Sequence, residues 1–554
     1  MISSRKKTNS ILAPNPHFGN ATFTQLIHHS NASVGTFSQR YWWNTEFWGG
    51  PGAPIIFYTP GESSAEYFLE VLQSNYSIIG LHAQAVRGAM IMIEHRYWGE
   101  SSPFQVLDTK NMTYLTLNNS IEDLVHFART ARLPFDHSGK SNAPKAPWVL
   151  FGISYPGALS AWTSKLSPGT FWAHHASSAP VEAIRDFWQY YEPIRSGMPR
   201  NCSDDFELMA DHFDQVFARG NGSEIVELKA MFGLENLASP GDVAQYSLLN
   251  LPESKTDNGH MYIVPTTRYA RFYRMCDTIQ GARPVNADDD PPFSSASNTS
   301  LPNPVDLTKA GRLRRALVNF AAWWKHDILS EECMSSGRNE FNSPNSIECF
   351  NTQDPTSPIF TDLSVSIVNG LRPWMWLICN EAFGWWQTGG APVRKPSLVP
   401  RAINVELFTR QCPLYFPPQG NAKVNSWKIP EVTNLLTDGW YLNTPRVLWV
   451  DGEFDPWRSA SVSSNFRKGG PRRSTPDQPV LVIKGGRHGN DLWTDSGESV
   501  GEIGNVQGQA VSQMFKWVNG FYDVEKRRQA GWGWLEPCKG DGSFCGGNLS
   551  KRRI

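Results

Sequence analysis

The sequence predicts an α/β fold in which a mostly parallel sheet is interrupted by a large helical insertion. Up to about residue 190, short apolar runs alternate with helical patterns, which is typical of parallel strands joined by crossover helices. Between about residues 191 and 430, apolar residues recur at helical spacing instead, and the strand pattern returns afterwards. The chain of 554 residues is also too long for one core, so an insertion or a second domain is expected.

Each predicted element follows from a local pattern. Apolar runs predict strands at 39–44, 53–58, 88–94, 147–151, 445–450 and 479–483. A helix is predicted from Ser120 to Thr130, with Ser120 as its N-cap and Asp123 three residues later. Helical spacing predicts further helices at 206–217, 313–324 and 508–522. The predicted organisation is a disordered segment (1–22), an α/β domain in two parts (23–190 and 431–524), a helical insertion (191–430) and a tail of unknown structure (525–554).

The composition gives no indication of several classes of partner. With 40% hydrophobic and 19% charged residues and a formal net charge of −1, the chain gives no argument for binding nucleic acid or a membrane surface. No run approaches the ~20 apolar residues of a membrane span. Its eight cysteines form no C-x-x-C pair, which argues against a zinc site. We expect neither a metal nor an organic cofactor.

Cysteines and glycosylation motifs indicate an oxidising compartment. An even number of widely spaced cysteines suits a few disulfides, and six of the eight fall in the predicted insertion. The start, Met1 to Lys7, is basic but is followed by no apolar signal-peptide core. The cysteines and the glycosylation motifs nevertheless predict N-glycans and an extracellular or vacuolar/lysosomal location. The N-x-S/T asparagines are Asn20, Asn31, Asn75, Asn111, Asn118, Asn201, Asn221, Asn298 and Asn548.

Ser154 is the candidate nucleophile. It follows the apolar run 147–151 and precedes a helical pattern, so a sharp strand–Ser–helix turn is predicted. The start of such a helix offers backbone N–H groups and a positive dipole to a developing oxyanion. The pattern here is G-x-S-x-P-G rather than strict G-x-S-x-G, and an ordinary junction with a surface serine is the alternative interpretation.

A serine nucleophile needs a base, and the base needs a carboxylate that orients it. His488 follows the predicted strand 479–483 and a glycine pair, and is the candidate base. After the strand 445–450, Asp451, Glu453 and Asp455 compete as the acid, and Asp455 lies furthest into the loop, where it could reach His488. The order Ser, acid, His is that of α/β-hydrolases. Asp491 is expected to be structural.

Longer motifs identify a family. The chain resembles the serine peptidase family that includes lysosomal prolyl carboxypeptidase and dipeptidyl peptidase II, and most resembles its fungal secreted prolyl endoprotease branch, over about residues 23 to 522. The matching motifs are GTFSQRYWWN (35–44), FYTPGE (57–62), EHRYWG (94–99), YLTL (114–117), SSAPVEA (177–183), CNE (379–381), RQCPLYFP (410–417), DPWR (455–458) and GG-x-H (485–488).

The resemblance implies an α/β-hydrolase fold with a large inserted helical cap. It also implies hydrolysis of proline-containing peptides or proteins on the carboxyl side of proline, and a pairing of Cys379 with Cys412. The implied site consists of the nucleophile Ser154, the acid Asp455, the base His488, oxyanion donors at the backbone N–H of Tyr155 and near Gly61 or Glu62, a proline pocket with Trp457 and Trp376, and Glu381 for polar groups of the substrate.

Three positions depart from the family pattern. Ile153 stands where the family has glycine, Pro156 where it has a small residue, and Gly489 where it often has cysteine. Proline is acceptable in the first turn of a helix, although it restricts the residue before it. For the two tryptophans, core packing is the alternative interpretation. Other readings of the function are a dipeptidyl-peptidase-type exopeptidase, an esterase or lipase on the same fold, or a catalytically weakened homologue.

Overall fold

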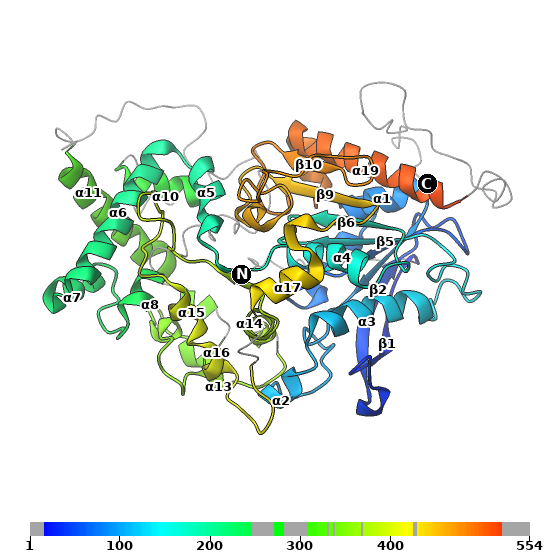
Figure 1. The fold of residues 1–554 in the computed structure, drawn as a ribbon, viewed down its shortest axis with the longest axis horizontal. Coiled ribbons are helices and arrows are strands. Elements are labelled where there is room, and N and C mark those ends of the chain that lie inside the picture. The colour runs from blue at the N-terminus through cyan, green and yellow to red at the C-terminus, as the bar shows by residue number, and fades with distance from the viewer. Residues whose placement is uncertain are drawn as a thin grey trace. The chain divides into compact units, whose positions relative to one another are not determined.

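The computed structural model describes residues 16–245, 271–281, 308–329, 332–335, 338–366, 369–424 and 429–522. These residues fall into two compact units (Figure 1). The sheet unit comprises 16–105, 114–182 and 434–522, and the helical unit comprises 106–113 and the described parts of 183–433. Residues 1–15 of the predicted disordered segment 1–22 and the whole predicted tail 525–554 lie outside the described residues.

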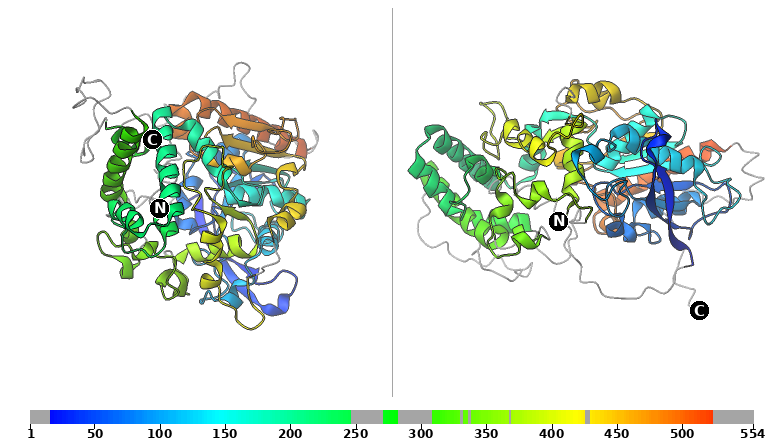
Figure 2. Two further views of the ribbon diagram at one scale, coloured as in Figure 1. Left: turned by 60° about the vertical axis from the view of Figure 1, so that its left-hand side comes forward. Right: turned by 90° about the horizontal axis from the view of Figure 1, so that it is seen from below.

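The sheet unit is organised around a mixed sheet. Among the described residues this sheet has eight strands in the order β1-β2-β4-β3-β5-β6-β9-β10. β1 and β2, in blue in Figures 1 and 2, pair antiparallel at one side, and all neighbours from β4 to β10 are parallel. The strands are β1 (Phe18–Leu26), β2 (Thr36–Asn44), β3 (Ile55–Tyr58), β4 (Ala89–Ile93), β5 (Trp148–Ile153), β6 (Ala173–Ser177), β9 (Val447–Gly452) and β10 (Val480–Ile483).

Helices cover both faces of the sheet. α1 (Ile78–Val86) and α19 (Gly501–Phe521) pack together on one face, and α3 (Leu117–Thr130) and α4 (Tyr155–Leu166) lie on the other (Figure 1). α18 (Thr494–Ser499) precedes α19. Because strands covered on both faces must be apolar throughout, β3, β4 and β5 are buried at every position, as their sequences predict. The protein has the predicted α/β-hydrolase fold.

The first strand corrects the predicted disordered segment. Residues 18–22, which the sequence analysis placed in that segment, belong to β1, whose partners on β2 run from Phe18 opposite Asn44 to Leu26 opposite Thr36. Phe23 of this strand packs edge-on against Phe127 of α3, with ring centroids 5.1 Å apart. Asn20, Thr22 and Thr24 are exposed and alternate with covered residues, as expected for an edge strand with one solvated face.

Two boundaries also differ from the prediction. α3 begins at Leu117 rather than after Ser120, because Thr116 is the N-cap and its Oγ1 accepts the Asn119 N–H at 3.1 Å. Residues 106–113, predicted in the α/β domain, group with the helical unit. The Leu107 N–H donates to Leu363 O at 2.7 Å, which accounts for this grouping.

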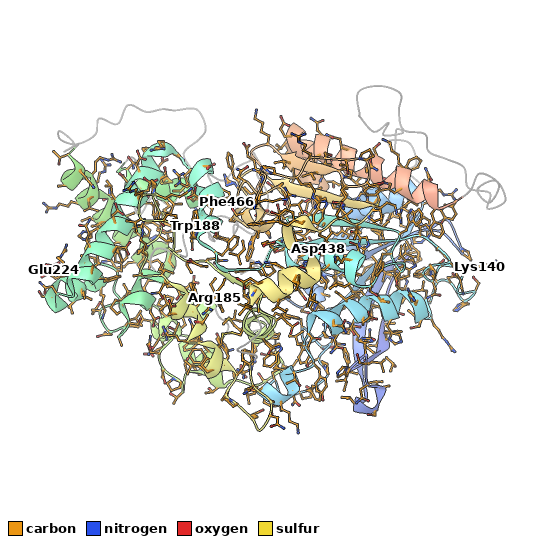
Figure 3. The ribbon with its side chains drawn as sticks, in the orientation of Figure 1. Lys140, Arg185, Trp188, Glu224, Asp438 and Phe466 are labelled. Atoms are coloured by element: carbon orange, nitrogen blue, oxygen red, sulfur yellow. A yellow bond between two sulfur atoms is a disulfide. The ribbon has the colours of Figure 1, made fainter. Side chains whose placement is uncertain are left out.

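The helical unit carries the disulfides of the described chain. They join Cys202 to Cys276, Cys333 to Cys349, and Cys379 to Cys412. The last pair confirms the one implied by the family resemblance, and Cys538 and Cys545 lie outside the described residues. In the same unit Lys395 lies over the ring of Trp188, which Figure 3 labels, with the ammonium 5.2 Å from the ring centroid.

The predicted helices 206–217 and 313–324 lie within α6 and α11. None of the described helices is long and apolar enough to cross a membrane. The helices of this unit are α2 (Thr109–Met112), α5 (Tyr191–Gly197), α6 (Arg200–Arg219), α7 (Gly222–Met231), α8 (Pro240–Ala244), α10 (Arg271–Ile279), α11 (Lys309–Trp324), α12 (Glu332–Ser335), α13 (Pro358–Thr361), α14 (Leu371–Asn380), α15 (Val405–Thr409) and α16 (Cys412–Tyr415). A short parallel pair, β7 (Ile184–Asp186) and β8 (Gly384–Trp386), accompanies them, and α17 (Pro430–Thr437) crosses the boundary between the units.

Candidate active site

Ser154 lies at the turn between β5 and α4. Its backbone has φ 64° and ψ −133°, a region that residues with a side chain rarely occupy. The turn is held on both sides, because the Ser154 N–H donates to Ser177 O at 3.0 Å and Ser154 O accepts the Ala158 N–H at 3.0 Å. The half-buried serine is therefore fixed in a strained conformation at the carboxyl end of a buried strand.

Two glycines permit this turn despite the unusual motif. A Cβ on Gly152 would lie 2.1 Å from Pro156 O, and one on Gly157 would lie 2.6 Å from Ser177 O. Pro156 occupies the first turn of α4, where proline is accepted. It also packs against Gly61, whose φ is +90° and whose Cβ would lie 2.4 Å from Pro156 Cγ. The loop after β3 thus approaches the serine turn closely.

Asp455 and His488 form a pair in the loops after β9 and β10. His488 Nδ1 lies 3.0 Å from Asp455 Oδ1 and 3.1 Å from Oδ2. Asp455 is buried and also accepts the Trp457 N–H at 2.9 Å, which fixes the carboxylate. Burial opposes a charge on His488, but the Asp455 carboxylate outweighs it and raises the His488 pKa above its ordinary value. Among the described residues, the hydrogen bonds of the His488 ring are those to Asp455, and none joins it to Ser154 Oγ.

The register of the sheet aligns these loops. Ile153 of β5 pairs with Ser177 of β6, Ser177 pairs with Val450 of β9, and Gly452 of β9 pairs with Ile483 of β10. Because the carboxyl ends of parallel strands meet at one edge, the turn with Ser154 and the loops with Asp455 and His488 share that edge. The His488 loop is attached there by the Gly489 N–H, which donates to Ser178 Oγ at 2.8 Å.

The competing carboxylates have other partners. Asp451 accepts hydrogen bonds from Ser461 Oγ at 2.8 Å and from Ser463 Oγ at 2.7 Å, and burial raises its pKa to about 7. Glu453 accepts the Gly485 N–H at 2.7 Å. These contacts leave Asp455 as the carboxylate that pairs with His488.

Asp491 lies in a buried polar chain beneath the His488 loop. Its carboxylate accepts a hydrogen bond from the Ser177 hydroxyl and lies 3.1 Å from Nε2 of His175. Nδ1 of the same His175 ring lies 3.0 Å from His82 Nε2. Burial keeps the His82 pKa well below its ordinary value. The sequence predicts a structural role for Asp491, whereas no motif marks either histidine.

Glu62 is the charged residue of the FYTPGE motif and follows Gly61, which packs against Pro156 in the serine turn. Partial burial raises the pKa of its carboxyl to about 7, while its own backbone N–H and His488 oppose the shift. A carboxyl group with this pKa changes its charge near neutral pH and interacts with the candidate base.

The three residues proposed to bind substrate are differently placed. Trp457 is half-buried beside the acid, and its ring centroid lies 6.4 Å from that of His488. Trp376 is buried in the helical unit and packs edge-on against Phe416, at 4.9 Å between centroids. Glu381 is also buried in that unit and accepts a hydrogen bond from Asn380 Nδ2 at 3.1 Å. Trp457 therefore belongs to the same unit as the Asp455–His488 pair, and the other two residues do not.

Among the described residues, no group of three or more His, Cys, Asp or Glu side chains is placed to hold a metal ion.

Comparison with known proteins identifies the family. The family model described as serine carboxypeptidase S28 matches residues 25–250 and 331–506. The serine protease vicPa of Bipolaris victoriae is 41% identical over 510 residues, which cover 92% of this chain and 90% of that protein. A probable extracellular serine carboxypeptidase of Arthroderma benhamiae is 27% identical, over 83% of this chain and 60% of its own, and the human lysosomal Pro-X carboxypeptidase is 21% identical, over 90% and 88%. The chain is thus a serine peptidase and belongs to the serine carboxypeptidase S28 family.

Proposed function

We propose that the protein hydrolyses peptide bonds on the carboxyl side of proline through Ser154, His488 and Asp455. The observation that carries the proposal is the approach of both Asp455 oxygens to His488 Nδ1, at the sheet edge where Ser154 is held in a strained turn. With Nδ1 engaged by the carboxylate, Nε2 of the neutral ring is the proton acceptor. The name of the human relative, a Pro-X carboxypeptidase, supports proline at the cleaved bond.

In the proposed mechanism, His488 Nε2 takes the proton from Ser154 Oγ as the oxygen attacks the prolyl carbonyl carbon. The backbone N–H groups of Tyr155 and of Gly61 or Glu62 stabilise the oxyanion. The C–N bond then breaks as His488 gives the proton to the leaving amine, which leaves an acyl-enzyme. Water, deprotonated by His488, attacks the ester, and Ser154 regains its proton when the acid product leaves.

Trp457 is proposed as the aromatic wall of the proline pocket, because its ring lies beside His488 and is not fully buried. Trp376 and Glu381 remain further candidates for substrate binding, and the packing of Trp376 on Phe416 favours a core role for that ring. Replacing Trp457 by Ala should reduce the preference for proline over alanine, whereas Ser154→Ala removes turnover of both.

The test is hydrolysis of a blocked X-Pro amide and the matched X-Ala amide by the wild type and by Ser154→Ala. We expect the wild type to prefer the prolyl amide and the variant to lose at least about 10⁴-fold in kcat. A free-acid X-Pro-Phe peptide and an internal prolyl bond, assayed together, separate carboxypeptidase from endopeptidase action. Equal cleavage of both amides would contradict proline specificity, and full activity of Ser154→Ala would contradict the nucleophile.

We also propose an extracellular or vacuolar/lysosomal location with N-glycans. The described disulfides support an oxidising compartment, and the relative from Arthroderma is named as extracellular. A mass decrease after enzymatic removal of N-glycans from secreted recombinant protein tests this. The glycosylation motifs with exposed asparagines are Asn20, Asn31, Asn118, Asn201 and Asn221.

A further inference from the structure

We propose that Glu94 and His95 are positioning residues that hold the two sides of the oxyanion hole. The proposal rests on the proposed function, in which backbone N–H groups of Tyr155 and of Gly61 or Glu62 receive the developing negative charge. Each of the two residues acts through a neighbour rather than on the substrate. Both come from the EHRYWG motif, which follows β4 and to which the sequence analysis assigned no role.

Glu94 fixes the loop on the Gly61 side. The buried carboxylate accepts the Ala65 N–H at 3.0 Å and the Ser64 hydroxyl at 3.3 Å, both through Oε1. These donors follow Gly61 and Glu62 after one intervening residue, Ser63, and Gly61 packs on Pro156 in the serine turn. A hydrogen bond to a charged acceptor is stronger than a neutral one, so this carboxylate restrains the loop firmly.

Arg40 makes the burial of Glu94 possible. Its Nε and Nη2 donate to the two carboxylate oxygens at 2.9 and 2.7 Å. Glu94 Oε2 also accepts the Ser101 hydroxyl at 2.7 Å. A Cβ on Gly99 would lie 1.9 Å from Glu94 Oε1, so the motif needs glycine there. The carboxylate is fully engaged and has a fixed orientation.

His95 fixes the Tyr155 side. Its Nδ1 lies 2.9 Å from Arg96 O, and its Nε2 lies 3.1 Å from Tyr155 Oη. Because a carbonyl oxygen can only accept, Nδ1 carries the hydrogen, and in the neutral ring Nε2 must accept the hydrogen of the Tyr155 hydroxyl. Burial lowers the His95 pKa to about 4, so the ring is neutral at neutral pH. The buried side chain of Tyr155 is thereby tied at its far end, which restrains the backbone that carries the proposed donor.

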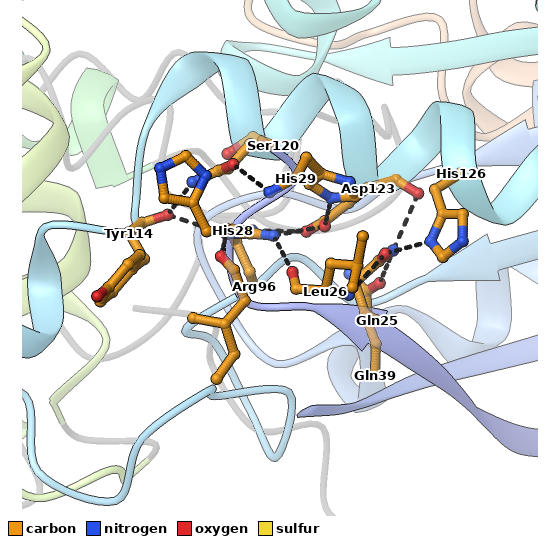
Figure 4. A network of polar contacts seen from close by, with 12 residues as sticks. Gln25, Leu26, His28, His29, Gln39, Arg96, Tyr114, Ser120, Asp123 and His126 are labelled. Carbon is orange, nitrogen blue, oxygen red and sulfur yellow. Dashed lines mark hydrogen bonds and ion pairs between the residues drawn. The ribbon is translucent and has the colours of Figure 1, made fainter. Parts of the chain in front are cut away.

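Arg96 anchors the motif between these two contacts. Its Nε and Nη2 donate to Asp123 at 2.6 and 2.5 Å, and its Nη1 donates to Ile27 O at 3.0 Å (Figure 4). Arg96 therefore attaches the segment to α3 and to the chain after β1. With its backbone fixed in this way, the motif can hold Glu94 and His95 as rigid supports for the two loops.

The expected effect follows from the geometry that oxyanion stabilisation requires. Donors must lie about 2.7–3.1 Å from the oxyanion, and loss of one donor costs about 10²–10³-fold in kcat. A misplaced donor should cost less than a missing one. We therefore expect a loss of about 10–100-fold in kcat from either support, with KM changed by less than about threefold.

The first test is a double-mutant cycle between His95→Phe and Tyr155→Phe. Each single variant should lose about 10–100-fold in kcat, and the double variant should lose no more, because both remove the same hydrogen bond. Affinity for a peptide aldehyde, whose tetrahedral adduct places an oxyanion in the hole, should fall by a similar factor. His126→Phe, a half-buried histidine of α3, is the control and should keep kcat within about twofold.

The second test compares Glu94→Gln with Glu66→Gln. Both side chains contact Arg40, but Glu66 is exposed and makes none of the loop contacts of Glu94. Glu94→Gln should reduce kcat and aldehyde affinity, and Glu66→Gln should change neither. Hydrolysis of p-nitrophenyl acetate is measured in parallel, because it needs an oxyanion hole but no proline pocket. A wild type without preference for proline would contradict the proposed function but not this proposal. Unchanged ester turnover in His95→Phe and Tyr155→Phe would overturn this proposal. Losses in kcat that are additive in the double variant would also overturn it.

Discussion

Asp123 in the sheet unit and Asp205 in the helical unit are both buried carboxylates paired with arginine, but their arginines differ in exposure. Asp123 receives Arg96, whose side chain is 0% exposed, and His29 at 2.8 Å (Figure 4). Asp205 pairs with Arg312 at 2.7 Å and Arg315 at 3.2 Å, whose side chains are 32% and 23% exposed. In the first pair both charges are removed from water, and in the second only the carboxylate is.

This difference matches the way each unit is stabilised. The central strands β3, β4 and β5 of the sheet unit are buried throughout, and its buried pairs Arg40–Glu94 and Arg96–Asp123 involve the EHRYWG motif. The helical unit has no such sheet among its described residues, and it contains the disulfides of the described chain. We infer that buried charges fix the positions of backbone segments in the sheet unit, while disulfides and half-exposed ion pairs stabilise the helical unit.

The largest expected effect on stability is that of Asp123→Asn. Removing this carboxylate leaves Arg96 buried without a counter-charge, which costs about 3–5 kcal/mol. Asp205→Asn is the matched substitution and should cost only about 1–3 kcal/mol, because its arginines can reach water. Urea denaturation at neutral pH measures both. An equal or larger loss for Asp205→Asn would contradict the comparison.

The same pair predicts a pH dependence. Burial would raise the pKa of Asp123, but Arg96 and His29 outweigh it and lower that pKa below its ordinary value. A lowered folded-state pKa contributes stability above the unfolded-state value, and this contribution is lost as the pH falls through the folded-state value. Asp123→Asn should therefore lose part of the acid-dependent decrease in unfolding free energy that the wild type shows, whereas Glu122→Gln should retain it.

A loss of stability similar to that of Asp123→Asn is expected from removing the disulfides, and only in the helical unit. Loop entropy predicts a loss of roughly 4 kcal/mol for Cys202→Ser with Cys276→Ser, which opens a span of 74 residues, and roughly 3 kcal/mol for Cys333→Ser with Cys349→Ser, which opens 16. Hydrogen exchange should increase in α6 and α10 for the first double variant. Labelling of Ser154 by a small fluorophosphonate should persist, and its loss would show that the two units do not respond separately.

The sequence predicted the candidate site best where an apolar strand is followed directly by the loop that contains a site residue. The apolar runs before Ser154, Asp455 and His488 predict strands, and β5, β9 and β10 form at those positions. β6 could not be predicted in this way, because its sequence A-H-H-A-S places two histidines in a buried strand. His174 is neutral there, since burial lowers its pKa to about 3, and it contacts Ser160.

Contacts between distant segments were also beyond the sequence. The motif with Glu94 and His95 could be recognised, but its hydrogen bonds reach Ala65 and Tyr155, at separations of 29 and 60 residues. Likewise, Trp376 and Glu381 were assigned from the resemblance alone, and their surroundings in the helical unit are a property of packing. Local patterns predict which elements form, whereas these partners depend on how the elements assemble.

The smallest expected effect is that of Glu62→Gln, which tests whether the Glu62 carboxylate raises the pKa of His488. Its carboxylate helps to raise the His488 pKa, and the base must be neutral to act, so activity is lost as the pH falls through that pKa. Removing the charge should lower the His488 pKa and move the acid limb of the kcat/KM profile to lower pH. Below the wild-type limb the variant should be the faster enzyme, while Glu66→Gln should leave the limb unchanged. A limb that stays in place or moves to higher pH in Glu62→Gln would mean that this carboxyl group does not act on the base.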